Sequence, residues 1–225
     1  MPDWAIIFDV DGVLLELTPA EEELFFIPFA SRCNASTLSR DWNSYRIRND
    51  EDIVAEIVKQ HGVAEVEKQK IRDEYLGLLH QQLKSGLVTS VEIKDARAIL
   101  SACSNFAVIG IATANFREAA KLRLEQAGLW HQVSHHAFGA DGGGAKSEIL
   151  ARALASIKLP KSNIIYIGDN INDVEAGLIN NVRFIGFSEN SDRLKILKAH
   201  GAEFLAQSHE QTWVIINQFL ESKQT

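Results

Sequence analysis

The sequence predicts an α/β protein, with a parallel β-sheet core and an all-helical block inserted after its first strand. Residues 6–8 (Ile-Ile-Phe) are uniformly apolar, as expected for a strand buried on both faces of a parallel sheet. Strand-like and helix-like segments alternate from about residue 88 onward, whereas no strand-like alternation occurs between residues 16 and 88. We therefore expect residues 1–15 and 88–225 to form the α/β core domain and residues 16–87 to form a helical domain.

The helical block, residues 16–87, is expected to contain several helices. Thr18 and Glu21 match a capping box, and Pro19 suits the first helical position, so the first helix should begin there. Pro28 should end or kink this helix, because proline lacks an N–H and clashes with the preceding turn. Apolar residues at helical spacing predict two further helices, over residues 49–62 and 66–84.

Beyond the helical block, the alternation indicates right-handed crossovers and a parallel sheet with helices on both faces. The expected strands cover residues 106–112, 137–138, 164–167 and 182–187. The expected helices cover residues 91–100, 116–126, 145–156, a short stretch from Asp173, and 210–220. An insertion directly after the first strand projects over the carboxyl end of that strand, so the helical block is expected to act as a lid.

Composition restricts the classes of partner. The 225 residues are 46% hydrophobic and 24% charged, with a net charge of -7, which argues against a broad nucleic-acid or anionic-membrane surface. The two cysteines, Cys33 and Cys103, have no paired spacing, which suits a reducing compartment and offers no zinc site. With no signal peptide visible and no apolar run of membrane-spanning length, we expect a cytoplasmic protein.

Two carboxylates, Asp9 and Asp11, follow the first predicted strand. In open parallel sheets ligands collect outside the carboxyl ends of the strands. Two adjacent acids repel each other unless a cation lies between them, and Mg²⁺ prefers oxygen ligands. Taken alone, the pair is equally compatible with a solvated turn.

Three further features of the sequence end or follow predicted strands, in the same way as Asp9 and Asp11 follow the first strand. Thr113 and Ala114 follow the strand at 106–112, where a hydroxyl and free N–H groups suit a phosphate oxygen, although threonine also caps helices. Asp169 follows the strand at 164–167, and Asp173 comes one helical turn later, so both can face one cation. Lys146 opens a helix, where the helix dipole disfavours it. It is therefore either a counter-charge for clustered carboxylates or a solvated side chain.

Taken together, this order of motifs resembles the haloacid dehalogenase-like hydrolase superfamily over nearly the whole chain. The closest likeness is to its phosphoglycolate phosphatase and phosphosugar phosphatase branch, and residues 169–177 (Asp-Asn-Ile-Asn-Asp-Val-Glu-Ala-Gly) carry much of it. The resemblance implies a Rossmann-like core, and the helical block matches the small helical cap of that branch. The chain departs from the branch at Ser147, where proline is frequent, and at Asn170, where threonine is frequent.

The resemblance implies an Mg²⁺-dependent phosphatase that hydrolyses a small phosphomonoester, phosphoglycolate-like or sugar-phosphate-like. Asp9 would attack phosphorus to form an aspartyl-phosphate, and Asp11 would serve as general acid and then general base. Lys146 would balance the charge on Asp9 and on the phosphoryl group. The implied metal residues are Asp9, Asp11 through its carbonyl, Asp169 and Asp173, and the implied phosphate-binding residues are Thr113, Ala114 and Lys146.

Substrate specificity is expected to come from the helical block, because the core would recognise only phosphate. Arg46 and Arg48 lie in the polar stretch 40–50, and arginine binds carboxylates and phosphates through a planar fork. Either of them can contact the substrate or simply occupy the surface. The expected partner is a small phosphorylated metabolite, with no nucleic acid and no membrane, and the oligomeric state is left open.

Three other functions are alternatives to a phosphatase. A phosphomutase of the same superfamily uses the same core but returns the phosphoryl group to a sugar. A dehalogenase needs no metal and would leave Asp11 without a purpose. A non-catalytic binding module would have been signalled by loss of Asp9, Asp11 or Lys146, and all three are present.

Overall fold

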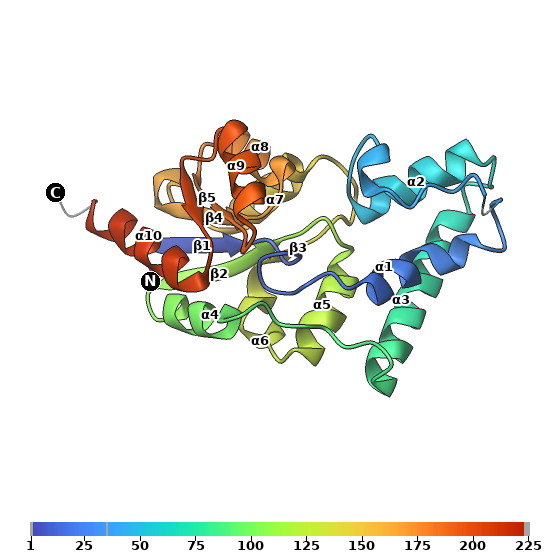
Figure 1. Ribbon diagram of the computed structural model, residues 1–225, viewed down its shortest axis with the longest axis horizontal. Coiled ribbons are helices and arrows are strands. Elements are labelled where there is room, and N and C mark those ends of the chain that lie inside the picture. The colour runs from blue at the N-terminus through green and yellow to red at the C-terminus, as the bar shows by residue number, and fades with distance from the viewer. Residues whose placement is uncertain (1, 35, 223–225) are drawn as a thin grey trace.

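The computed structural model describes residues 2–34 and 36–222, and its core is a six-stranded parallel sheet (Figure 1). The strand order is β3-β2-β1-β4-β5-β6, and every pair of neighbours is parallel. The strands are β1 (Trp4–Phe8), β2 (Ala107–Ala112), β3 (Ala137–Phe138), β4 (Ile164–Gly168), β5 (Arg183–Phe187) and β6 (Phe204–Ala206). This architecture confirms the predicted α/β, Rossmann-like fold.

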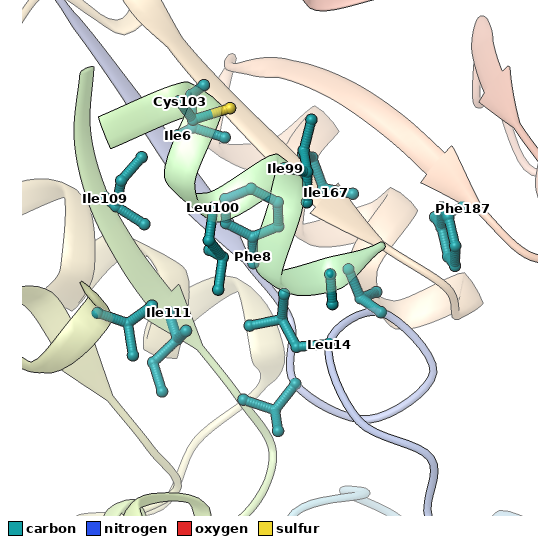
Figure 2. Close-up of a cluster of buried hydrophobic side chains, with 14 of the residues drawn as sticks. Ile6, Phe8, Leu14, Ile99, Leu100, Cys103, Ile109, Ile111, Ile167 and Phe187 are labelled. Atoms are coloured by element: carbon teal, nitrogen blue, oxygen red, sulfur yellow. The ribbon is translucent and has the colours of Figure 1, made fainter. Parts of the chain in front are cut away.

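Helices cover both faces of the sheet because the strand side chains alternate between two apolar clusters. The first cluster takes Ile6 and Phe8 of β1 and contains the side chains shown in Figure 2. The helices packed on it are α4 (Ala96–Ser104), α5 (Arg117–Gln126), α6 (Trp130–Val133) and α10 (His209–Glu221). The second cluster takes Ala5 and Ile7, and its helices are α7 (Lys146–Ser156), α8 (Ile171–Asn180) and α9 (Ser191–Ala199).

The helical block lies beyond one end of the sheet, away from both chain termini (Figure 1). Its helices are α1 (Pro19–Phe26), α2 (Asp50–Gln60) and α3 (Glu67–Ser85), and two short 3-10 turns cover Ile27–Phe29 and Trp42–Ser44. The capping box at Thr18 forms as predicted, and α1 ends before Pro28. The apolar cluster of the block also includes Ala119 of α5 and Phe116, the residue directly before α5, so the block packs on that core helix.

The structure corrects the predicted helix over residues 91–100, since α4 begins only at Ala96. The preceding residues pair with the chain that follows β1. The Glu16 N–H donates to the Val91 carbonyl at 2.8 Å, and the Ile93 N–H donates to the Leu14 carbonyl at 3.0 Å. These hydrogen bonds join the two connections between core and helical block, and the first of them occupies the Val91 carbonyl, which a helix beginning at residue 91 would need as an acceptor.

Among the α-helices and strands of the described residues, α6, α9 and β6 were not predicted from the sequence. The first and last are four and three residues long, too short for a periodic pattern. The helix predicted from Asp173 begins two residues earlier, because the Asn170 side chain caps it. No helix in the described part of the chain is long and apolar enough to cross a lipid bilayer.

Candidate active site

Asp9 lies at the carboxyl edge of the sheet, directly after β1. Its N–H donates to the Ile167 carbonyl at 2.8 Å, which continues the pairing of β1 with β4. Its Oδ1 accepts the Val10 N–H at 2.7 Å, and the residue is only 6% exposed. The backbone of two central strands therefore holds this carboxylate in place.

Asp169 and Asp173 join Asp9 to form an acidic trio. One oxygen from each of the three carboxylates lies within 4.8 Å of the others. Asp173 is completely buried; its Oδ1 accepts the Tyr166 hydroxyl at 2.5 Å, and its Oδ2 accepts the Asn170 N–H at 3.0 Å. The sequence prediction that Asp169 and Asp173 face one point therefore agrees with this geometry.

Lys146 lies between two members of the trio. Its Nζ is 2.9 Å from Asp9 Oδ2 and 2.8 Å from Asp173 Oδ1, and its side chain is 2% exposed. The lysine stands in the first turn of α7, where the helix dipole opposes it, and the two carboxylates compensate for that position. A buried ammonium needs such partners, and their charges hold the pKa of Lys146 above its ordinary value despite burial.

The trio carries more negative charge than Lys146 neutralises. Burial raises the pKa of Asp9 well above its ordinary value, and although Lys146 opposes the shift, Asp173 and Asp169 add to it. Burial and the nearby Asp173 raise the pKa of Asp169 to about 7. The repulsion between closely spaced buried carboxylates is reduced either when one of them is protonated or when a cation binds between them.

The donor set fits Mg²⁺. Carboxylate and amide oxygens are the ligands that hard divalent cations prefer. Asn172 Oδ1, beside Asp173 in sequence, is buried and has no hydrogen-bond partner among the described residues, and Asn172 lines the same cavity as Asp9 and Asp169. The side chain of Asp11 lies outside the trio, and only its carbonyl remains as the ligand that the resemblance implies.

Asp11 is held by a buried arginine. The Arg123 Nη1 donates to Asp11 Oδ1 at 2.6 Å, and its Nε donates to Glu21 Oε1 at 2.8 Å. The Arg123 side chain is 2% exposed, whereas that of Asp11 is 24% exposed and lines the cavity. Burial lowers the pKa of Arg123, but Asp11 and Glu21 outweigh burial and leave that pKa above its ordinary value.

Thr113 and Ala114 follow β2 at the same edge of the sheet and line the cavity. The Thr113 N–H donates to the Phe138 carbonyl at 3.0 Å, and the Asn115 N–H donates to Thr113 Oγ1 at 3.2 Å. The Ala114 N–H makes no hydrogen bond to another described residue. A ligand oxygen therefore has that N–H available at this turn, whereas the Thr113 hydroxyl donates to Asn115 Oδ1 at 3.3 Å and must turn from it to bind a ligand.

The start of α2 brings the helical block onto these core loops. The Asp50 N–H donates to the Ala114 carbonyl at 2.9 Å, and Asp50 Oδ2 accepts the Phe116 N–H at 2.7 Å. Asn49 Nδ2 donates to the Gly144 carbonyl at 2.7 Å. Asp50 is 4% exposed, and burial together with the charge of Asp11 raises its pKa to about 7, against the opposing Phe116 N–H and Arg123.

The cavity at this site has a volume of about 410 Å³, and Arg48 lines it. Arg48 Nη1 donates to Asn43 Oδ1 at 2.8 Å, and Asn43 also lines the cavity. Arg46 is exposed and does not line the cavity. Its backbone N–H donates to Glu56 Oε2 at 3.1 Å. Of the two arginines expected to face a substrate, the structure thus brings only Arg48 to the site.

Sequence reasoning missed Arg123, Asp50 and Arg193. Arg193 Nε donates to the Asp169 carbonyl at 2.9 Å from α9, which was itself not predicted. A signal existed for Arg123, because it follows Ala119 and Ala120 at helical spacing and therefore falls on the buried face of α5. No local pattern distinguishes Asp50, since an acid in the first turn of a helix is common.

Comparisons with known proteins agree with this geometry. A family model described as haloacid dehalogenase-like hydrolase matches residues 5–178. No curated protein sequence matches the chain.

Solved structures share the fold at low sequence identity. CbbY from Rhodobacter sphaeroides, in complex with phosphate, has 15% identity and a TM-score of 0.72, with 92% of this chain and 95% of that chain covered. β-Phosphoglucomutase from Clostridium difficile has 19% identity and a TM-score of 0.70, with 100% of both chains covered. A putative phosphoglycolate phosphatase from Lactobacillus plantarum has 16% identity and a TM-score of 0.58, with 82% of this chain and 86% of that chain covered. From the family match and the convergence of its motifs on one edge of the sheet, the chain belongs to the haloacid dehalogenase-like hydrolases.

Proposed function

We propose that this hydrolase is an Mg²⁺-dependent phosphatase that acts on a small phosphomonoester through an aspartyl-phosphate intermediate. The observation that carries the proposal is Lys146 Nζ, which lies within 2.9 Å of both Asp9 and Asp173 while Asp169 completes the acidic trio. A site with one fixed ammonium beside three carboxylates is suited to phosphoryl transfer, in which charge neutralisation and positioning dominate catalysis.

In the first half-reaction a carboxylate oxygen of Asp9 attacks phosphorus, and the bond from phosphorus to the leaving oxygen breaks. Asp11 donates its proton to that leaving oxygen, and the alcohol departs. Lys146 balances the charge on Asp9 and the phosphoryl group. Thr113 Oγ1 and the Ala114 N–H bind the non-bridging oxygens as they gain charge.

In the second half-reaction Asp11, now ionised, takes a proton from water, and the water oxygen attacks phosphorus. The bond to Asp9 breaks, which releases inorganic phosphate and restores both aspartates. Mg²⁺ would be held by Asp9, Asp169, Asp173 and the Asp11 carbonyl, and when bound it supplies Lewis-acid neutralisation of phosphoryl charge.

The substrate belongs to the small phosphorylated metabolites, phosphoglycolate-like or sugar-phosphate-like. A cavity of about 410 Å³ is of the size that typically encloses a small ligand. Residues 16–87 form the cap that excludes water from it, residues 1–15 and 88–225 form the catalytic core, and the protein acts in the cytoplasm, without a nucleic-acid or membrane partner.

The test is phosphate release from a panel of phosphomonoesters, including phosphoglycolate, hexose phosphates and p-nitrophenyl phosphate. We expect turnover that requires Mg²⁺ and disappears when EDTA removes it. Full activity after chelation would exclude the metal assignment. If none of the esters yielded phosphate, the phosphatase assignment would be wrong.

A phosphomutase is the second candidate, favoured by one observation. Arg48 supplies a guanidinium to the cavity from the helical block, separate from Lys146, and so offers a second place for a phosphate group. Product analysis with a hexose phosphate separates the two functions, because a mutase yields an isomeric hexose phosphate and a phosphatase yields free sugar and inorganic phosphate.

A further inference from the structure

Arg123 is a buried cation to which the proposed mechanism gives no task. It ranks among the largest fully buried side chains of the described residues, and its guanidinium binds carboxylates and carbonyls from three directions. Nη1 donates to Asp11 at 2.6 Å, Nε donates to Glu21 at 2.8 Å, and Nη2 donates to the Glu16 carbonyl at 2.9 Å. Burying an arginine is costly unless every donor is satisfied, so this arrangement calls for an explanation.

The arrangement leaves the two oxygens of Asp11 unequal. Oδ1 accepts the Arg123 N–H, whereas Oδ2 has no partner among the described residues. A proton carried by Asp11 therefore resides on Oδ2, because an N–H donor already occupies Oδ1.

Glu21 extends this group to both connections between the core and the helical block. Its Oε2 accepts the Thr18 N–H at 3.0 Å on the first connection, and its Oε1 accepts the Ser90 hydroxyl at 3.3 Å on the second. Glu21 is 3% exposed and lies in α1, whereas Arg123 lies in the core helix α5. Glu21 therefore links Arg123 to both connections between the core and the helical block.

We propose that Arg123 is a positioning residue for Asp11, and that Glu21 holds Arg123 in place from the helical block. This inference rests on the proposed function, in which Asp11 transfers a proton to the leaving oxygen and later removes one from water. Arg123 directs Asp11 Oδ2, the oxygen that carries the proton, toward the cavity. Because Glu21 belongs to the helical block, proton transfer by Asp11 depends on the seating of that block against the core.

The test compares Arg123→Lys with the wild type on two esters. Lysine keeps the charge but lacks the planar fork that binds two carboxylates and a carbonyl together. Glycerol 2-phosphate has a basic leaving group that needs a general acid, whereas p-nitrophenolate leaves without one. The measured quantity is kcat/KM, which covers the steps up to departure of the leaving group and so excludes the later hydrolysis.

We expect Arg123→Lys to lower kcat/KM about 100-fold for glycerol 2-phosphate but less than about threefold for p-nitrophenyl phosphate. Asp11→Asn should show the same contrast, and the double variant should lose little more than Asp11→Asn alone, because both changes remove one function. Glu21→Gln, which leaves Arg123 in place, should give a smaller loss of the same kind and serves if Arg123→Lys does not fold.

Arg32→Lys is the matched control, because Arg32 is 14% exposed, forks between Glu67 and Glu74, and does not line the cavity. It should show no contrast between the two esters. Equal losses on both esters in Arg123→Lys, or additive losses in the double variant, would overturn the inference.

If the wild type hydrolysed neither of these two esters, crystal structures of the variants would decide the inference instead, and the proposed function would fail only if no ester of the wider panel yielded phosphate. An Asp11 carboxylate that turns away from the cavity in Arg123→Lys, but not in Arg32→Lys, supports the positioning role. An unmoved carboxylate contradicts it.

Discussion

At the scale of single residues, the acidic trio concentrates charge that one lysine offsets only in part. Asp9 and Asp173 share Lys146, whereas Asp169 pairs only loosely with Arg193, at 3.9 Å. The buried carboxylates and the ammonium are mutually dependent, because removing one partner leaves an uncompensated charge.

Replacement of the proposed nucleophile tests the covalent step. Asp9→Asn keeps the side-chain shape and should keep the fold, but an amide oxygen is too weak a nucleophile to attack phosphorus. We expect kcat to fall by about 10⁴-fold or more. Turnover is measured by phosphate release, with mass spectrometry to exclude deamidation back to aspartate. Near-normal turnover by the Asp9→Asn variant with its amide intact would contradict the aspartyl-phosphate mechanism.

Asp50 should make stability depend on pH. Its pKa is raised from the ordinary 3.8 to about 7, so the folded protein retains a proton that the unfolded chain loses between these values. Stability contributed by this proton is present at low pH and lost as pH rises toward 7. Asp50→Asn keeps the acceptor for the Phe116 N–H and removes the titration, so it should gain about 2–4 kcal/mol relative to wild type between pH 4 and pH 8.

The measurement for Asp50→Asn is urea unfolding of both proteins across this pH range. Asp73→Asn, an exposed acid on α3, is the control substitution. A difference between Asp50→Asn and wild type that stays constant with pH would show that Asp50 does not retain the proton.

At the scale of elements, the turn after β1 and the start of α2 shape the site. Gly12 has φ of +72°, and a Cβ there would lie 2.4 Å from Asp169 Oδ2. The turn therefore passes so close to Asp169 that only glycine fits. The first residues of α2 bind two core loops at once, which places Arg48 over the cavity.

Gly12→Ala should disturb both the fold and the acidic trio. Backbone strain should cost about 1–3 kcal/mol, and displacement of Asp169 should weaken stabilisation by Mg²⁺. Gly62→Ala is a matched control, because Gly62 has φ of +64° but its Cβ would meet nothing within 4 Å. Thermal unfolding with and without Mg²⁺ separates the effects. Identical Mg²⁺ responses in the two variants would contradict the close approach of Gly12 to Asp169.

Arg48→Ala tests the contribution of the helical block to specificity. We expect kcat/KM to fall about tenfold or more for the best metabolite of the phosphomonoester panel, and less for p-nitrophenyl phosphate, because loss of a charge-assisted hydrogen bond costs about 1.5–3 kcal/mol. Arg46→Ala, outside the cavity lining, should have the smaller effect of the two. Equal losses on both substrates would assign Arg48 to the fold or the core site.

At the scale of the whole molecule, the core and the helical block form one packed unit in this structure. Ala119 of α5, and Phe116 directly before this helix, belong to the apolar cluster of the block. Gln126 of α5 donates to the Leu83 and Val88 carbonyls near the second connection. One core helix therefore contacts the helical block, the second connection and, through Arg123, the proposed general acid.

Mg²⁺ should stabilise the entire fold, because its proposed ligands come from two segments that lie far apart in the chain and that unfolding separates. At a concentration one hundred times the Kd, the expected gain is about 2.7 kcal/mol, measured as a rise in Tm. Asp169→Asn should abolish most of this rise, whereas Asp192→Asn, an exposed acid on α9, should leave it intact. An equal rise in Asp169→Asn would exclude Asp169 as a ligand.

The sequence alone determined the strand ends and therefore the position of most of the acidic site. Buried strands are apolar throughout, and parallel strands end at a common edge, so Asp9, Thr113 and Asp169 were assigned to one place by local pattern. The same local logic failed at residues 91–95, whose backbone pairs with the chain after β1. It also failed for β6, which is too short for its pattern to be recognised.

Only the tertiary structure decided which distant side chains meet at this edge. Arg123 and Asp11 are 112 residues apart, and Asp50 and Phe116 are 66 apart. Helical periodicity indicates that a face is buried but does not specify the residue against which it is buried, and it cannot separate Arg48 in the cavity from Arg46 outside it. The physical reason is that such contacts depend on how the helical block packs on α5, which is a property of two packed surfaces and is encoded in neither segment alone.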